Sequence, residues 1–184
     1  MFYIPHYHYH VEEWSQVKEA TLTAIYNRYN TELQSELGKN ERIHTTYFKR
    51  DETNGAEFEL FISIIVPYLQ KVNEENSGLK FYGEQTLTNI TDIWYQVQNH
   101  CEYHSIHNHG TEGWSAVFYA DYDPLVHEAT KFYCPMVSDK TGNIHTFQPN
   151  VEEGDLIVFP SQINHESIVN RSNKPRSIIS FNIR

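Results

Sequence analysis

Two histidines, His107 and His109, lie two positions apart in the segment NHCEYHSIHNHGTEGWSAVFY, residues 99–119. Apolar and polar residues alternate on both sides of this pair, which is typical of a β-strand. In a strand, residues i and i+2 point to the same face, so the two imidazoles can approach one point. This spacing therefore suits the binding of a metal ion.

A third histidine, His165, lies in the segment DLIVFPSQINHESIV. A ferrous centre that activates dioxygen needs a few ligands on one side and open positions for dioxygen and an organic chelate on the other. Two histidines on one strand and one histidine on another strand can provide such a half-open site. We therefore expect His107, His109 and His165 to bind one metal ion.

Arg176 follows His165 by eleven residues and opens the segment RSIISFNIR. Strand alternation would place Arg176 on the same face as Ile178 and Ser180. If that face points inward, the charged side chain is costly to bury unless an anion meets it, and a guanidinium matches a carboxylate in shape. The alternative is a surface arginine at the start of a strand, next to Pro175.

Composition narrows the class of protein that positions these residues. The 184 residues are enough for one domain with a sizeable core. Aromatic residues make up 14% of the chain and favour sheets, because they pack well on a pleated surface. The net charge of −10, with no basic stripe outside residues 174–176, argues against duplex nucleic acid as a partner.

The first 77 residues are dominated by helical periodicity. Apolar residues recur at helical spacing over residues 11–37, with a break expected near residues 29–32, and again from Ala56 to about Glu75, where Pro67 should bend the helix. The N-terminal segment also holds His6, His8 and His10 at alternate positions. A strand with this pattern could bind a metal, but no further ligand lies close in sequence, so we leave these histidines out of the site.

From Leu79 onward, short segments rich in β-branched and aromatic residues alternate with turn residues, which indicates a sandwich or barrel. We expect strands near residues 80–86, 90–98, 102–108, 114–121, 130–134, 144–147, 155–159, 164–169 and 175–183. The predicted fold is mainly β, of the α+β type: a double-stranded β-helix, or jelly roll, braced by N-terminal helices. It forms one domain over residues 1–184, in which residues 1–77 are a helical buttress and residues 78–184 the jelly-roll core.

Cysteine content and hydropathy indicate where such a protein works. Cys101 and Cys134 are the only cysteines, too few for a disulfide scaffold, and we expect both to be buried and unpaired. The N-terminus lacks a signal-peptide pattern, and no apolar run approaches the length of a membrane span. These features predict a cytoplasmic protein that does not associate with a membrane.

The carboxy-terminal half, from about Trp94 to Asn182, resembles the 2-oxoglutarate and iron(II)-dependent oxygenases. The similarity is greatest to their prolyl-hydroxylase-like branch, which occurs in bacteria and their phages. Four segments carry the resemblance in the same order: YHSIHNHG, WSAVFYADYDP, EEGDLIVFPSQINHESIVN and KPRSIISFNIR. If the chain is phage-encoded, the host-cell cytoplasm is its expected location.

The resemblance implies a role for each matching residue. His107 looks like the first ligand of the family's HxD/E motif, His165 like its distal histidine, and Arg176 like the residue that pairs with the distal carboxylate of 2-oxoglutarate. His109 stands where the motif has a carboxylate; HxH also occurs in this branch, and Asp121 or Glu112 is the alternative third ligand. Tyr103 and Tyr119 are expected to line the 2-oxoglutarate pocket.

The implied protein is an enzyme that uses iron(II), 2-oxoglutarate and dioxygen. It would hydroxylate a C–H bond of a peptidyl or small-molecule substrate and release succinate and carbon dioxide. The protein would orient the target and exclude water, while metal and co-substrate carry the chemistry.

Two other readings use the same residues. A cupin-type metal-binding enzyme or binding protein would use His107, His109, Glu112 and His165 without 2-oxoglutarate, and it would have no use for Arg176. A non-catalytic binding domain would keep the barrel without iron chemistry. Bound metal and the role of Arg176 separate these readings from the oxygenase.

Overall fold

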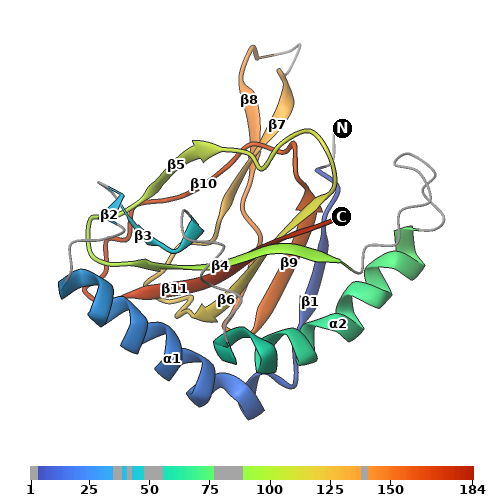
Figure 1. Ribbon diagram of the computed structural model, residues 1–184. Helices are drawn as coiled ribbons and strands as arrows, with labels where there is room; N and C mark the ends of the chain where they lie inside the picture. Colours follow the sequence, from blue (N-terminus) through green and yellow to red (C-terminus); the bar gives the residue numbers. More distant parts are fainter. Residues whose placement is uncertain (1–3, 35–38, 41–42, 48–55, 77–88, 138–140) are drawn as a thin grey trace.

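Two antiparallel sheets face each other in the computed structural model, which describes residues 4–34, 39–40, 43–47, 56–76, 89–137 and 141–184 (Figure 1). The larger sheet has seven strands in the order β1 (Tyr7–His10), β9 (Asp155–Pro160), β6 (Trp114–Asp121), β11 (Arg176–Ile183), β4 (Ile90–Gln98), β3 (Ile43–Thr45) and β2 (Lys39–Asn40). The smaller sheet has four strands in the order β5 (His104–His107), β10 (His165–Ser167), β7 (Lys131–Val137) and β8 (Ile144–Phe147).

The eight strands β4 to β11 form the double-stranded β-helix. Four of them, β4, β6, β9 and β11, lie in the larger sheet, and the other four lie in the smaller sheet. The chain crosses between the sheets repeatedly, so residues distant in sequence become neighbours across a strand pair. The predicted jelly roll is thereby confirmed, and eight of its nine strands are present; the expected strand at 80–86 lies outside the described residues.

The two faces of the larger sheet have different roles. In β11, Ile179, Phe181 and Ile183 pack toward the helices, whereas Arg176 and Ile178 point toward the smaller sheet. Because side chains alternate along a strand, Ser180 and Asn182 share the inner side with Arg176. The larger apolar cluster therefore lies against the helices, and the space between the sheets holds a smaller apolar cluster together with polar groups.

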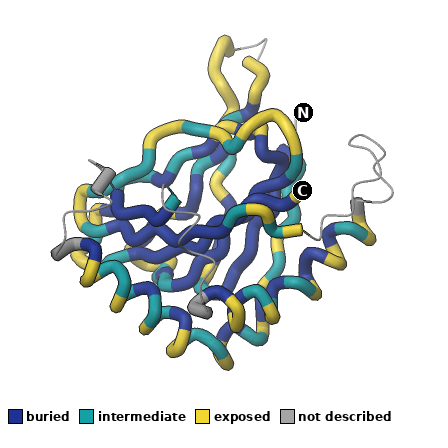
Figure 2. Tube along the Cα trace, in the orientation of Figure 1, coloured by how far each residue is buried: buried dark blue, intermediate teal, exposed yellow. Residues whose placement is uncertain are grey.

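Two helices, α1 (Trp14–Gln34) and α2 (Ala56–Asn76), cover the outer face of the larger sheet. Figure 2 shows buried residues on their sheet-facing side and exposed residues on the other.

The expected break near residues 29–32 is wrong, because α1 continues to Gln34. Contacts hold this region: the Asn99 side chain donates to the Tyr29 hydroxyl at 2.7 Å, and Arg28 pairs with Glu32 at 2.9 Å. Helix α2 also continues through Pro67.

The residues before the jelly roll add strands as well as helices. Strand β1 pairs with β9 along its whole length, and β3 pairs with β4. Residues 1–77 are therefore not only a helical support, since they widen the larger sheet at both edges. Neither helix among the described residues combines the length and apolar character needed to span a membrane.

The two cysteines are both free thiols, but only one is buried. Cys134 lies in the core between the sheets, as expected. The prediction for Cys101 is wrong, because this residue is exposed in the turn after β4. The turn requires a left-handed backbone at Cys101, with φ of 64°, and its N–H donates to the Asn170 carbonyl at 2.8 Å.

Phe61 of α2 provides a test of the core between helices and sheet. Its ring is fully buried and lies 4.9 Å from the ring of Phe118 and 6.1 Å from that of Phe181. We expect Phe61→Ala to lower the free energy of unfolding by about 3–5 kcal/mol, measured by urea denaturation, because it leaves a cavity. The neighbouring Leu60→Ala, on the exposed side of α2, should change it by less than about 0.5 kcal/mol. Equal effects of the two substitutions would contradict this packing.

Candidate metal centre and anion pocket

The three predicted histidines come together between the two sheets. His165 in β10 lies directly opposite His107 in β5, and their ring centroids are 4.4 Å apart. His109 lies two residues beyond the end of β5, with its ring 4.9 Å from that of His165 and 5.3 Å from that of His107. One ring nitrogen from each histidine lies within 4.8 Å of the other two. A single metal ion can therefore contact all three.

Hydrogen bonds fix which nitrogen each ring offers. His107 Nδ1 lies 2.8 Å from the Ser105 carbonyl, and His165 Nδ1 lies 2.9 Å from the Ile163 carbonyl. A carbonyl oxygen only accepts, so Nδ1 of each ring carries the proton and donates it. Each Nε2 then has a free lone pair for a metal, which is the usual arrangement of a metal-binding histidine.

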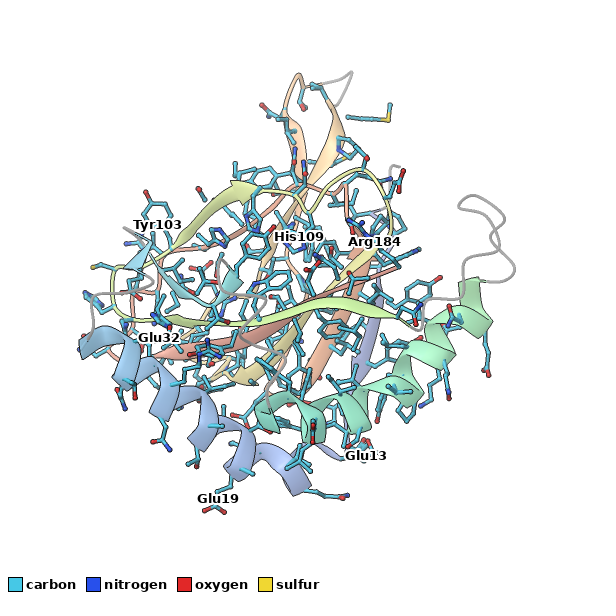
Figure 3. All side chains as sticks on the ribbon, viewed as in Figure 1. Glu13, Glu19, Glu32, Tyr103, His109 and Arg184 are labelled. Carbon is cyan, nitrogen blue, oxygen red and sulfur yellow. The ribbon has the colours of Figure 1, made fainter. Side chains whose placement is uncertain are left out.

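His109 is oriented by a chain of polar side chains. Its Nδ1 donates to Asn182 Oδ1 at 2.9 Å, and the Asn182 amide donates in turn to Asp92 Oδ2 at 3.2 Å. The contact with Asp92 fixes the amide so that its oxygen faces the imidazole. The Ser115 hydroxyl also lies 2.9 Å from His109 Nδ1. Figure 3 shows His109 inside the molecule, above β4 and β11.

The loop after β5 holds His109 at this depth. The backbone N–H of His109 donates to the Ser161 carbonyl at 2.9 Å, which ties the loop to the end of β9. At Gly113 the backbone has φ of +81°, and a Cβ there would lie only 2.6 Å from the Ile183 carbonyl oxygen. A glycine is therefore required where the chain turns back into β6.

Burial keeps these imidazoles neutral. Loss of solvent lowers the pKa of His109 to about 4, lowers that of His107 and lowers that of His165 well below its usual value. The negative charge of Asp92 raises the pKa of His109, but burial outweighs it. Near neutral pH all three rings therefore offer lone pairs rather than protons, and this donor set fits a divalent ion such as iron(II).

A fourth imidazole, His104, lies against this cluster. Its ring stacks on that of His107 with 3.9 Å between centroids, and its Nδ1 lies 3.1 Å from the Gln96 amide nitrogen. Burial and the neighbouring histidines lower the pKa of His104 to about 3. His104 therefore provides an uncharged wall for the ring of His107.

Arg176 is buried on the inner face of β11, with only 2% of its surface exposed. Its Nη1 donates to the Glu128 carbonyl at 2.9 Å, whereas Nε and Nη2 are buried without a hydrogen-bond partner among the described residues. Burial lowers the pKa of the guanidinium. The Nε and Nη2 groups of this buried cation suit a carboxylate, which would accept a hydrogen bond from each of them and supply the balancing negative charge.

Aromatic side chains support this guanidinium. Its central carbon lies 5.8 Å from the ring centroid of Tyr119 and 5.9 Å from that of Tyr122. The Tyr119 hydroxyl accepts a hydrogen bond from the Thr130 N–H at 3.1 Å, and the Thr130 hydroxyl is itself buried without a partner in the described part of the chain. Arg176 and the Thr130 hydroxyl, next to Tyr119, are therefore the donors that could hold a small carboxylate.

Other residues singled out in the sequence do not join the histidines. Figure 3 shows Tyr103 just before the start of β5, with its side chain directed away from His109. Glu112 is exposed, and neither it nor Asp121 has a ligand atom in the histidine group. Asp121 lies at the far end of β6 from Ser115, where its carboxylate accepts from the Tyr26 hydroxyl at 2.7 Å. The cupin arrangement with Glu112 as a ligand therefore finds no support in this geometry.

The residues that orient His109 were missed in the sequence. Asn182 and Ser115 are register partners on β11 and β6, and Asp92 lies opposite Asn182 on β4. In the sequence, Ser115 and Asn182 each stand between apolar residues, in the segments WSAVF and ISFNI, and a polar residue in such a place can indicate a site. The strand pairing that makes them neighbours could not be read from those segments alone.

Comparisons with known proteins agree with this geometry. Residues 92–182 match the family described as "Putative 2OG-Fe(II) oxygenase". This range runs from Asp92 to Asn182 and includes all three histidines and Arg176. No match was found among curated proteins.

Solved structures share the fold across nearly the whole chain. A prolyl-4-hydroxylase from Pseudomonas putida is 14% identical with a TM-score of 0.58, and the match covers 98% of this chain and 92% of that one. A prolyl hydroxylase from Trichoplax adhaerens, solved with a peptide of hypoxia inducible factor, is 13% identical with a TM-score of 0.61, covering 97% and 83%. The epimerase SnoN, solved with Fe3+, alpha ketoglutarate and nogalamycin RO, is 11% identical with a TM-score of 0.61, covering 98% and 78%.

The buried guanidinium of Arg176 leads to a prediction about the free energy of unfolding of the ligand-free protein. We expect Arg176→Met to raise the free energy of unfolding by about 1 kcal/mol or more, because an apolar side chain replaces a buried cation that lacks a counter-ion. Urea denaturation in a buffer free of dicarboxylates measures this. Arg171→Met, at an exposed position, is the control and should stay within about 0.5 kcal/mol of the wild type. Destabilisation by Arg176→Met would show that the guanidinium is already satisfied by the protein.

Proposed function

Because this chain belongs, through residues 92–182, to the 2-oxoglutarate and iron(II)-dependent oxygenases, we propose that it hydroxylates a C–H bond of a peptidyl or small-molecule substrate. One oxygen atom of dioxygen enters the product, and the other enters succinate as 2-oxoglutarate loses carbon dioxide. Iron(II) and 2-oxoglutarate are the cofactors of this reaction. When bound, they supply the oxidising chemistry, and the protein supplies binding, orientation and exclusion of water.

The proposal rests on two groups of residues buried in the same interior, the three histidines and Arg176. Three neutral imidazoles converge on one point between the sheets. The same interior holds a guanidinium whose Nε and Nη2 groups have no hydrogen-bond partner in the part of the chain that the structure describes. A metal-binding protein without a dicarboxylate co-substrate has no use for a buried, uncompensated cation. A site that takes both a metal ion and a dicarboxylate explains both features.

Each group then has a defined task. His107, His109 and His165 would hold iron(II) through Nε2, and Arg176 would hold the distal carboxylate of 2-oxoglutarate through Nε and Nη2. The Thr130 hydroxyl is the additional donor for the carboxylate.

Aromatic walls keep water from the reacting groups. The Phe159 ring lies edge-on to His165 with 4.8 Å between centroids, and the Trp94 ring lies edge-on to His109 at 5.3 Å. Both side chains are almost fully buried. A dry site strengthens the interaction between the metal, the dicarboxylate and the guanidinium, because little solvent screens their charges.

Exposed apolar residues on β5 and on the β7–β8 hairpin support the proposed substrate class. Ile106 lies next to His107 on β5 and is exposed, and Met136, Val137 and Ile144 are exposed on the β7–β8 hairpin, which projects beyond the barrel (Figure 1). With a net charge of −10, this apolar rim favours an uncharged or cationic peptidyl or small-molecule substrate over duplex nucleic acid.

Anaerobic titration with iron(II) and 2-oxoglutarate tests the assignment, with the metal-to-ligand charge-transfer absorption as the readout. We expect the wild type to form the band and Arg176→Met to weaken 2-oxoglutarate binding at least about 100-fold. Two charge-assisted hydrogen bonds are lost, each worth about 1.5–3 kcal/mol. Iron(II) affinity should be unchanged in Arg176→Met and lost in His107→Ala.

The control is Arg171→Met, which removes an exposed arginine and should leave both affinities unchanged. The proposal fails if His107→Ala keeps full iron binding, or if Arg176→Met keeps the wild-type affinity for 2-oxoglutarate. Succinate release coupled to dioxygen uptake in the wild type is the confirming measurement.

The polar chain behind His109 gives a separate prediction. We expect Asn182→Leu to weaken iron(II) binding about 10–100-fold, because His109 loses the group that fixes its tautomer and orientation. Equilibrium dialysis against a competing chelator measures the affinity, and circular dichroism checks the fold. Ser180→Ala, on the same inner face of β11, should have no effect. If Asn182→Leu binds iron as tightly as Ser180→Ala does, Asn182 is not a support for the ligand.

A further inference from the structure

A second cluster of potential metal ligands lies where β1 meets β9. His8 and His10 are alternate residues of β1 on one face of the strand, and His10 is the register partner of Asp155. His10 Nδ1 lies 2.8 Å from Asp155 Oδ1, and His8 Nε2 lies 2.8 Å from Asp155 Oδ2. Glu152 Oε1 lies 3.8 Å from His10 Nδ1. Two imidazoles and two carboxylates thus meet from segments about 145 residues apart in sequence.

This cluster is separate from the histidines between the sheets. Asp155 begins β9, whereas Phe159, which contacts His165, lies near the other end of the same strand. Four residues of a strand span about 13 Å. His8, His10, Glu152 and Asp155 line a surface hollow of about 500 Å³, together with Pro124, Asn150 and Val151. A small ion can therefore reach the cluster from solvent.

The distances fit a tetrahedral ion. Zinc binds nitrogen and oxygen ligands at about 2.0–2.2 Å, so neighbouring ligand atoms of a tetrahedral site are about 3.3–3.5 Å apart. The separations of His10 Nδ1 from the two carboxylates, 2.8 and 3.8 Å, lie on either side of this value. The three ligand atoms of His10, Glu152 and Asp155 all lie within 4.8 Å of one another. Shifts of about half an ångström would bring both carboxylates to this spacing from His10 Nδ1.

Burial and charge also favour an ion. Asp155 is 4% exposed, and His10 and Glu152 are exposed, so the cluster has one fixed ligand and two that can adjust. The two carboxylates bring a formal charge of −2. The nearby Lys18 pairs with Glu153, at 2.5 Å, rather than with either of them. A divalent cation would balance that charge directly.

We propose that His10, Glu152 and Asp155 form a second metal site, selective for zinc(II) or a similar borderline divalent ion, in which His8 orients Asp155 through its other carboxylate oxygen. Nitrogen and carboxylate ligands suit such ions, and a ligating carboxylate is usually held by a hydrogen bond from a neighbouring residue, as Asp155 is by His8. The site joins the edge strand β1 to β9 and to the loop at Glu152. Its role is structural, and it does not depend on the proposed oxygenase reaction.

Titration of the apo-protein with zinc(II) alone, followed by calorimetry, tests the site in four chains. The wild type is expected to bind two equivalents, and one equivalent should remain in His107→Ala/His165→Ala, which lacks the ligands between the sheets. Glu152→Gln should also bind one, and the combination of all three substitutions none. Glu152 is exposed, so Glu152→Gln leaves the fold intact. His145→Ala, at an exposed histidine of β8, is the matched control and should bind two equivalents.

Thermal unfolding supplies a second readout. Zinc(II) should raise the melting temperature of His107→Ala/His165→Ala but not that of the same chain with Glu152→Gln. His8→Ala should weaken the remaining site about 10–100-fold, as loss of a supporting residue does. If His107→Ala/His165→Ala binds no zinc, or if Glu152→Gln leaves its affinity unchanged, the cluster is only a set of hydrogen bonds to Asp155 and the proposal is overturned. A wild type that binds one equivalent, lost in Glu152→Gln, would still support this site while counting against the one between the sheets.

Discussion

A buried guanidinium that has no counter-ion among the described residues is the main constraint on this fold. In the described part of the chain, Arg176 contacts one carbonyl oxygen and the faces of two tyrosine rings, and its Nε and Nη2 groups have no hydrogen-bond partner. A cation in that state costs several kcal/mol in the folded protein. The free energy that offsets it comes from elsewhere, chiefly from the aromatic core between the larger sheet and the two helices.

The two faces of each central strand carry different residues, one set that packs against the helices and another that faces the smaller sheet. On β6, Ala116, Phe118 and Ala120 pack toward the helices, whereas Val117 and Tyr119 belong to the inner cluster. On β11 the same alternation separates Phe181 from Arg176 and Asn182. Because the outer face carries most of the stabilisation, the inner face can hold polar groups whose arrangement is unfavourable until ligands bind. Rigid strands also keep the histidines and the arginine in a fixed relation, which a site on flexible loops would not.

Local patterns predicted the elements of this fold well. The alternation at residues 90–98 and 114–121 corresponds to β4 and β6, and helical spacing found both helices. The HxH spacing and the distant His165 likewise predicted the meeting of three imidazoles. The expected reason was only partly right, because β5 ends at His107 and His109 is positioned by the loop that follows.

The features that were missed depend on pairing between distant strands. The histidines of β1 seemed to lack further ligands, because Asp155 approaches them only through the pairing of β1 with β9. Asn182 behind His109, likewise, is identified only once β11 is placed beside β6. These contacts depend on how distant strands pair, which local propensity does not determine.

The absence of a carboxylate from the three-imidazole set has an electrostatic consequence. Neutral ligands leave the full charge of a divalent ion in place, whereas a carboxylate ligand would remove one unit of it. The carboxylate of Asp92 compensates from a distance, since Asn182 links it to His109 by two hydrogen bonds. In the proposed complex, the larger part of the compensation would come from the dianionic co-substrate. Metal and co-substrate would then strengthen each other's binding by the same factor, as thermodynamic linkage requires, and the missing carboxylate would make that coupling stronger.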